Sequence, residues 1–197
     1  TFCMCPGGEI IPATPKTGCL CTNGMSNAAR SGQYANSAIV TTLEPESFSN
    51  PREAYGFLDS LEKKAFALGG EDYTCPAQNA LDFMRGTNGK LRRGSSWAFG
   101  VKGAQIDSLL PEHITRALRR ALAHFDDNAP GFIAHGLLAG VETRVSSPVR
   151  FERSEETLES SAANLYLAGE GAGMAGGIVS SAIDGIRIAE AVLKKTK

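Results

Sequence analysis

Apolar residues follow two different spacings along the chain, which separate a strand-rich first part from a helix-rich middle. In residues 1–43, short segments rich in β-branched residues are bounded by turn residues. "GEIIPAT" and "GCLCTNG" predict two strands joined through "PKTG", and "SAIVTTL" predicts a third. We therefore expect a small sheet at the start of the chain.

The middle of the chain has apolar residues three or four positions apart, the spacing of amphipathic helices. The first such segment is "PREAYGFLDSLEKKAFALGG", which Asn50 caps and Gly69 and Gly70 end. A second helix is expected after Pro76, ending at Gly86, and a third in "DSLLPEHITRALRRALAHF". Its arginines form a solvated face: Arg116, Arg119 and Arg120.

Three further segments complete the secondary-structure prediction. Residues 86–103 are polar, basic and rich in glycine, which favours an exposed loop. Residues 131–153 predict short strands, and "NLYLA" at residues 164–168 predicts a last strand before a glycine loop and a helix over about residues 177–194. The predicted fold class is α+β: mixed small sheets with packed helices, followed by a terminal strand and helix.

The terminal helix has one narrow polar stripe in an otherwise apolar or small-residue surface: Ser180, Asp184, Arg187, Glu190 and Lys194. Such a helix is typical of the interior of a domain. Only one predicted strand precedes it, so we expect the rest of that domain to lie upstream of Thr1.

The loop before this helix contains a literal Gly-x-Gly-x-x-Gly pattern at Gly171, Gly173 and Gly176. In a dinucleotide-binding βαβ unit, a second strand follows the helix, with an acidic residue about 20 positions after the glycines. After Lys195 only two residues remain. The pattern is therefore not the usual dinucleotide motif.

Composition and charge exclude few classes of protein. Twenty Lys and Arg against 21 Asp and Glu give a net charge of -1, without the excess of positive charge typical of nucleic-acid binding. No apolar run is long enough to span a bilayer, and the first residues do not resemble a signal peptide. We expect a cytoplasmic protein with a small-molecule substrate and neither a nucleic-acid nor a membrane partner.

Five cysteines stand at positions 3, 5, 19, 21 and 75. Their odd number argues against a disulfide framework. Four of them form Cys-x-Cys pairs, whereas zinc knuckles commonly use Cys-x-x-Cys, so ordinary buried thiols are favoured over a metal site. A zinc or thiol protein that uses Cys3, Cys5, Cys19 and Cys21 remains an alternative.

The closing pattern "NLYLAGEGAGMAGGIVSSAIDGIRIAEAV" resembles the carboxy-terminal FAD motif of glutathione-reductase-like flavoproteins. More narrowly, "FCMCPGGEI", "TNGMS" with "ANSAIV", and "GVETRVSSPVRF" resemble bacterial FAD-dependent dehydrogenases. The resemblance implies a Rossmann-like FAD domain whose first βαβ unit is amino-terminal and to which the end of the chain returns. It also makes NAD(P)H a candidate electron donor.

The resemblance assigns the cofactor contacts to the loop and the first turn of the helix. Glu170 stands where that family more often has Asp, placed to accept hydrogen bonds from the ribityl or pyrophosphate region. The helix N-terminus would point its partial positive charge at the flavin. The implied FAD-binding residues are Gly169, Glu170, Gly171, Gly173, Gly176, Gly177 and Ile178.

Candidate substrate contacts are fewer. The resemblance places Cys5 near the flavin, and Gly7 and Gly8 allow a close approach of the backbone. Arg144 and Arg150 are candidates to hold a substrate carboxylate or the cofactor phosphate, although pairing with Glu142 or Glu152 is the commoner arrangement. The three histidines offer neither triad nor metal spacing, so no catalytic residue and no metal ligand is predicted.

We therefore expect a substrate-side domain over residues 1–160 and, over residues 161–197, the last strand and helix of an FAD-binding domain. The whole protein would be an FAD-dependent oxidoreductase, and this chain alone would be inactive. The alternative from another class is a non-catalytic domain that binds a ligand or partner through residues 86–103.

Overall fold

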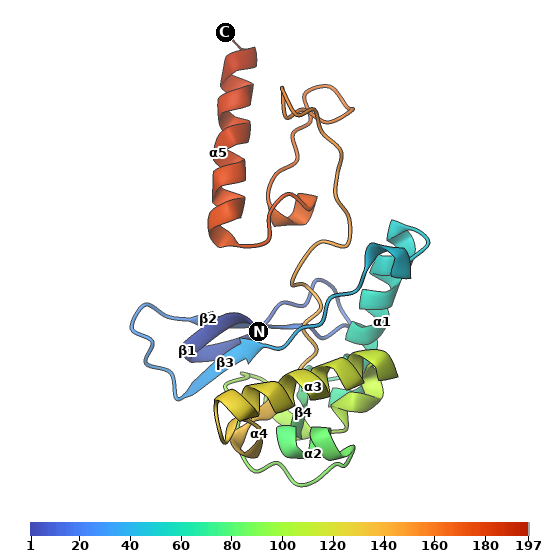
Figure 1. Cartoon of the computed structure of the whole chain (residues 1–197), viewed down its shortest axis with the longest axis vertical. Coiled ribbons are helices and arrows are strands. Elements are labelled where there is room, and N and C mark those ends of the chain that lie inside the picture. Colours follow the sequence, from blue (N-terminus) through green and yellow to red (C-terminus); the bar gives the residue numbers. More distant parts are fainter. Residues whose placement is uncertain (197) are drawn as a thin grey trace. The chain divides into compact units, whose positions relative to one another are not determined.

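The computed structural model describes residues 1–196 of the 197 and divides the chain into two compact units. Unit 1 contains residues 1–44 and 56–143, and unit 2 contains residues 45–55 and the chain from residue 144 onward. Two three-stranded sheets and several helices make up the fold, so the α+β class is confirmed (Figure 1). The expected domain boundary near residue 160 stays a prediction.

The first sheet of unit 1 is antiparallel, with strand order β2-β1-β3. It consists of β1 (Phe2–Pro12), β2 (Thr22–Ser26) and β3 (Tyr34–Ala38). The sheet was predicted, but its third strand was expected at residues 37–43. The register aligns Ala38 with Phe2, the first residue of β1, so residues 39–43 have no β1 residue opposite them. They have no regular structure.

The second sheet has the order β5-β4-β6, in which β4 (Cys75–Asn79) lies parallel to β5 (Val101–Gly103) and antiparallel to β6 (Leu137–Ala139). The prediction missed β4 and placed a helix from Pro76 instead. That helix, α2, begins at Ala80 and ends at Arg85, where Gly86 adopts a left-handed conformation with φ 66°. Every residue of β4 is buried, so its sequence lacks the alternation that reveals a half-exposed strand.

The two long predicted helices are confirmed as α1 (Pro51–Gly69) and α3 (Glu112–Asn128). At the start of α1, the Oδ1 of Asn50 accepts a hydrogen bond from the Glu53 amide at 3.1 Å, as its position predicted. Shorter pieces complete unit 1: the 3₁₀ helix η2 (Ile106–Leu109) and α4 (Phe132–His135). The 3₁₀ helix η1 (Pro45–Ser47) belongs to unit 2.

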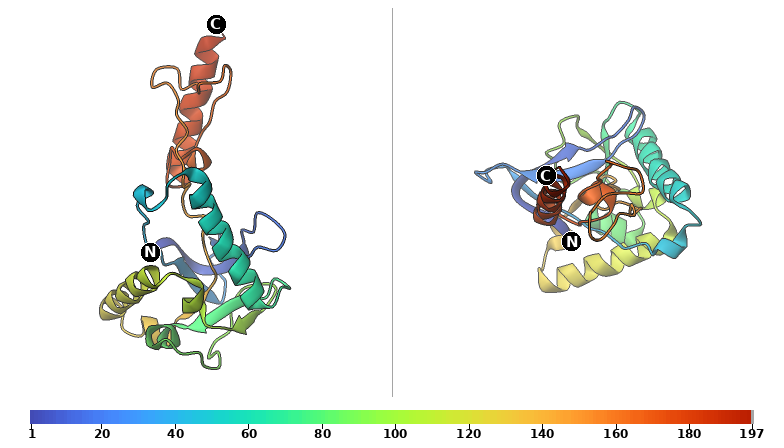
Figure 2. Two further views of the ribbon diagram at one scale, coloured as in Figure 1. Left: turned by 90° about the vertical axis from the view of Figure 1, so that its right-hand side faces the viewer. Right: turned by 90° about the horizontal axis from the view of Figure 1, so that it is seen from above.

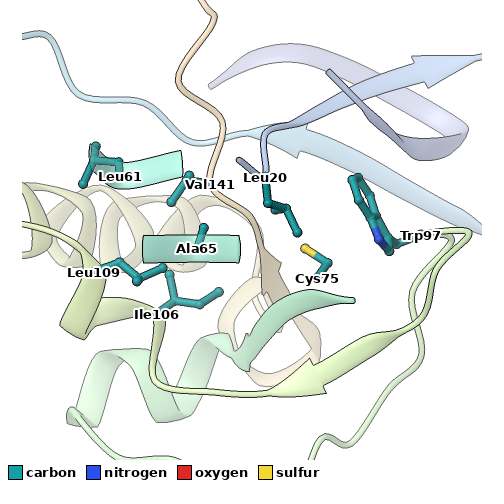
Figure 3. Packing of buried hydrophobic residues seen from close by; sticks show 8 residues of the cluster. All are labelled: Leu20, Leu61, Ala65, Cys75, Trp97, Ile106, Leu109 and Val141. Carbon is teal, nitrogen blue, oxygen red and sulfur yellow. The ribbon is translucent and has the colours of Figure 1, made fainter. Parts of the chain in front are cut away.

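The core of unit 1 collects residues from six different segments (Figure 3). Its buried members are Leu20, Leu61, Ala65, Cys75, Trp97, Ile106, Leu109 and Val141. Trp97 comes from the segment expected to be an exposed loop, yet it is only 4% exposed, and its ring nitrogen donates to the Tyr73 carbonyl at 2.9 Å. The same segment also contains β5, so Trp97 and the pairing of β5 with β4 both anchor the expected loop to unit 1.

Arg119 corrects the expectation of a solvated arginine face on α3. Its guanidinium pairs with the nearly buried Asp107 at 2.8 Å, donates to the Phe83 carbonyl at 2.8 Å and lies over the Phe83 ring. Asp107 in turn accepts from the buried Gln78 at 3.2 Å. The arginine therefore links α3 to η2 and α2 inside unit 1.

We expect Arg119→Ala to lower the free energy of unfolding by about 2 kcal/mol, because it leaves the Asp107 carboxylate without its charged partner. Arg116→Ala is the matched control on the same helix: Arg116 is 67% exposed, and its ion pair with Glu112 spans 4.0 Å. Exposed pairs of this kind contribute at most about 1 kcal/mol. Chemical unfolding of both variants tests this, and equal losses would contradict the assigned role of Arg119.

Unit 2 is built around α5 (Ile178–Lys195), beside which the irregular chain of residues 144–177 runs (Figure 2). The predicted strand at residues 164–168 does not form. A strand needs a neighbour to satisfy its backbone, and this segment is held otherwise: the Leu165 carbonyl accepts from the Ser160 amide and the Leu167 carbonyl from Arg153. Lys195, at the end of α5, pairs with Glu159 at 2.7 Å.

The burial of α5 differs from the expectation that most of its circumference is covered. Asp184, expected on a polar stripe, is its one buried residue among those described. Five of its apolar side chains are 46–90% exposed instead: Ile178, Val179, Ile183, Ile186 and Leu193. Ile188 and Val192 are half-buried. In the described chain, the helix therefore packs through the face that carries Asp184, Ile188 and Val192, and it leaves an apolar stripe uncovered.

Candidate functional site

The predicted cofactor residues form one continuous segment, residues 169–177 and the first turn of α5, and we call residues 169–177 the glycine loop. It opens with Gly169 at φ 72° and a single 3₁₀ turn, η3 (Glu170–Ala172). Two backbone hydrogen bonds close the turn, from the Gly173 amide to the Glu170 carbonyl at 2.8 Å and from the Met174 amide to the Gly169 carbonyl at 3.0 Å. The first part of the loop is therefore an ordered turn.

Two glycines of the loop are required by the fold of unit 2 itself. Gly169 and Gly173 both have φ near 70°, a region that residues with a side chain rarely adopt. At Gly173, moreover, a Cβ atom would lie 2.3 Å from the Val149 carbonyl oxygen and 2.8 Å from the Arg150 Cα. Chain geometry alone explains both glycines.

The other three glycines have no such explanation. Neither Gly171, Gly176 nor Gly177 has a left-handed φ. A Cβ atom on Gly171 or Gly176 would meet nothing within 4 Å, and one on Gly177 would meet only the Ser180 hydroxyl at 3.9 Å. The space beside them is open, as a loop that approaches a ligand closely requires.

The helix that follows the loop begins without a side-chain cap. Gly177 is its N-cap residue, and no side chain hydrogen-bonds there within the described chain. The first intrahelical bond of this turn runs from the Ser181 amide to the Gly177 carbonyl at 2.9 Å. The backbone N–H groups of Ile178, Val179 and Ser180 therefore have no acceptor within the helix, and they can donate to an anionic group.

The remaining predicted contacts lie at the two ends of the loop. Glu170 is half-buried within η3, and Ile178, at the start of α5, is 90% exposed. All seven predicted residues thus lie in the ordered turn, the open glycine segment or the first turn of α5, and their contact with a cofactor stays a prediction.

Sequence reasoning missed Asp184 and Arg153, which form an ion pair behind the loop. The pair is bidentate, with nitrogen–oxygen distances of 2.5 and 3.0 Å, and the Gly169 amide donates to the same carboxylate at 2.9 Å. The Arg153 guanidinium, together with the Gly169 amide, lowers the pKa of Asp184. The pair therefore stabilises the folded chain above the ordinary Asp pKa and ceases to do so as the pH falls through the lowered value.

The candidate substrate residues divide between the units: Cys5, Gly7 and Gly8 belong to unit 1 and Arg144 to unit 2. The Cys5 thiol donates to the Cys3 carbonyl at 3.4 Å. Packing alone requires both glycines. A Cβ on Gly7 would lie 1.8 Å from the Arg30 carbonyl oxygen, and one on Gly8 would lie 2.4 Å from that of Met25. Their contact with a substrate stays a prediction.

The cysteines give no support to the zinc alternative. Cys19, Cys21 and Cys75 are buried in unit 1. No group of three or more His, Cys, Asp or Glu side chains within residues 1–196 is arranged to hold a metal ion. Burial raises the pKa of Cys75 to about 12, so that thiol stays protonated and unreactive at neutral pH.

Residues 86–103, the basis of the non-catalytic alternative, contribute two aromatic side chains to a shallow hollow. Trp97 and Phe99 line it together with residues from two other segments: Pro12, Thr14, Pro15, Lys16, Thr17 and Tyr73. The hollow has a volume of about 390 Å³. Lys16 at its margin pairs with Asp59 at 2.5 Å.

Within residues 1–196, no helix is long and apolar enough to cross a membrane.

Two comparisons with known proteins find sequences that are similar to this chain. An uncharacterized protein of Clostridium beijerinckii is 40% identical over 200 residues, which cover 99% of this chain and 38% of that protein. The chain thus spans well under half the length of this relative. Residues 1–145 match the family model described as "FAD-dependent protein, C-terminal domain-like". The match ends before the glycine loop but covers most of the chain, which therefore belongs to the FAD-dependent protein C-terminal domain-like family.

Proposed function

We propose that this chain is the carboxy-terminal part of an FAD-dependent oxidoreductase and that its glycine loop, with the first turn of α5, contributes to the FAD site. The observation that carries the proposal is the set of three glycines that the fold does not need. Gly171, Gly176 and Gly177 have open space where a side chain would stand. Gly176 and Gly177 lie directly before a helix that has no side-chain cap.

The residues present fit such a cofactor. The open backbone at Gly176 and Gly177 lets a planar ring or a phosphate come close, and the first N–H groups of α5 supply donors for its negatively charged edge. When bound, FAD supplies the transfer of a hydride or an electron pair. The role of this chain would be to orient the group, donate hydrogen bonds and exclude water.

The uncovered apolar stripe of α5 supports the same proposal. Ile183, Ile186 and Leu193 are 46–61% exposed, an unusual exposure for large apolar side chains on one helix. We infer that the remainder of an FAD-binding domain covers them. The family relationship concerns FAD alone and gives no support to NAD(P)H as electron donor, and the substrate would be a small molecule of unassigned class.

We expect the purified full-length protein to be yellow, with absorption bands of bound flavin and FAD near one per chain. The 197-residue chain alone should hold none, because it supplies only one loop and one helix end to the cofactor. Absorption spectra and the flavin released on denaturation measure both. A colourless full-length protein that takes up no added FAD would contradict the proposal, as would stoichiometric flavin in the isolated chain.

The non-catalytic alternative keeps one observation in its favour, the aromatic hollow beside Trp97 and Phe99. Its volume lies at the lower end of the range of small-molecule sites. The same spectra separate the two candidates, since a ligand-binding module without flavin would be colourless.

A further inference from the structure

We propose that Asp184, held by Arg153, is a positioning residue that fixes the backbone of residues 167–173 in the form that receives the flavin cofactor. This inference rests on the proposed function and adds to it two residues outside the predicted site. Neither side chain belongs to the glycine loop. Each acts through the backbone of the loop or of the residues just before it.

The pair is buried and geometrically specific. Asp184 is 6% exposed, and the side chain of Arg153 is 13% exposed. Two parallel hydrogen bonds join the guanidinium to the carboxylate, at 2.5 Å and 3.0 Å. A bidentate arrangement fixes the relative orientation of the two groups as well as their distance. The pair can therefore serve as a rigid reference point between α5 and the preceding chain.

The pair forms hydrogen bonds with the backbone on both sides of Ala168. The Gly169 amide donates to Asp184 Oδ2 at 2.9 Å, and Arg153 Nη1 donates to the Leu167 carbonyl at 3.0 Å. Gly169, with its positive φ of 72°, is the residue from which the backbone enters the 3₁₀ turn η3. The direction in which the glycine loop leaves this point is thus set by one carboxylate and one guanidinium.

The segment that carries Arg153 also fixes the far end of the turn. The Phe151 amide donates to the Ala172 carbonyl at 3.1 Å, and the Val149 carbonyl lies where a side chain on Gly173 would have to stand. Residues 149–153 therefore contact the loop at both Gly169 and Gly173, directly or through Asp184. An Arg153–Asp184 ion pair that only attached α5 to the preceding chain would not require these contacts with the backbone of the glycine loop.

The energetics also argue for a positioning role. A buried ion pair often adds no net stability over an apolar pair of the same size, because both charges lose their hydration. An apolar side chain at position 184 would leave the Gly169 amide without its acceptor. Lysine at position 153 would keep the charge but lose the planar fork that reaches Asp184 and Leu167 together.

The test uses the full-length protein, stripped of flavin, with Asp184→Asn and Arg153→Lys as variants. Glu190→Gln, which removes an exposed carboxylate from the same helix, is the matched control. FAD is titrated into each folded apoprotein by flavin fluorescence. Amide hydrogen exchange of residues 167–173 is measured without FAD.

We expect at least about a tenfold rise in the Kd for FAD in both Asp184→Asn and Arg153→Lys, together with faster exchange at residues 167–173. The control should match the unmodified protein in both measurements. A purely structural role predicts a lower melting temperature with an unchanged Kd in the folded fraction. That result, or an equal loss in the control, would overturn the proposal.

The exchange measurement keeps this inference separate from the proposed function. If the unmodified protein binds no FAD, the proposed function fails, but exchange in the apoprotein still shows whether Asp184 orders the loop. Unchanged exchange in both variants would overturn the positioning role whatever the affinity for FAD. Should Asp184→Asn not fold, Arg153→Lys carries the same two measurements, because it retains a positive charge beside Asp184.

Discussion

Gly177→Val in the full-length protein is expected to remove bound FAD while the apoprotein still folds. Gly177 has an extended backbone, with φ −176° and ψ 176°, that any residue can adopt. A Cβ there meets only the Ser180 hydroxyl at 3.9 Å. The apoprotein should therefore lose at most about 1 kcal/mol, the cost of a poor N-cap residue. If the cofactor fills the open space, the branched side chain should weaken FAD binding by roughly a hundredfold, equivalent to about 3 kcal/mol.

Two companion variants make this result interpretable. Ser180→Ala removes an exposed hydroxyl that donates to the Gly177 carbonyl at 3.0 Å, and it should leave flavin content nearly unchanged. Gly173→Ala places a methyl group 2.3 Å from the Val149 carbonyl oxygen, so it should lower both flavin content and the stability of the apoprotein. Flavin per chain and thermal unfolding of the three apoproteins are the measurements. Full flavin in Gly177→Val would remove the glycine loop from the cofactor site.

Helices with regular apolar spacing could be predicted from the sequence, because the apolar spacing and the capping residues that indicate a helix lie within a few positions of one another. Asn50 and Gly70 mark the ends of α1, and the structure places its termini there. The strand β4 could not be predicted in this way. "CPAQN" is buried throughout and has no alternation, and a proline in a central strand argues against a strand at all.

In the candidate site, too, features that depend on neighbouring residues could be predicted, whereas contacts between residues far apart in the sequence could not. The sequence places the seven candidate cofactor residues in one segment, but it cannot separate the glycines that the fold needs from those that it does not. Gly173 is required because Val149, 24 positions earlier, lies against it. Asp184 shares a helical stripe with exposed polar residues, and only the position of Arg153 reveals that it is buried.

Gly7→Ala is expected to lower the free energy of unfolding of the chain by about 4 kcal/mol or more. A loss of this size is exceptional for a point mutation and indicates a severe steric conflict. Gly7 has φ 54°, and a Cβ on it would lie 1.8 Å from the Arg30 carbonyl oxygen. Backbone atoms are hard to displace here, because the Gly32 amide donates to the Gly7 carbonyl at 2.9 Å. The added methyl group must therefore separate β1 from the turn before β3.

Gly18→Ala separates this clash from the strain of a left-handed backbone. Gly18 has φ 74°, yet a Cβ there meets nothing within 4 Å, so its replacement should cost only about 1 to 2 kcal/mol. Denaturant unfolding of both variants of the 197-residue chain gives the difference. If Gly7→Ala costs no more than Gly18→Ala, the close packing of β1 against residues 30–32 is wrong. Gly7 would then lack a packing reason, and the contact with substrate that the sequence suggested would become its better explanation.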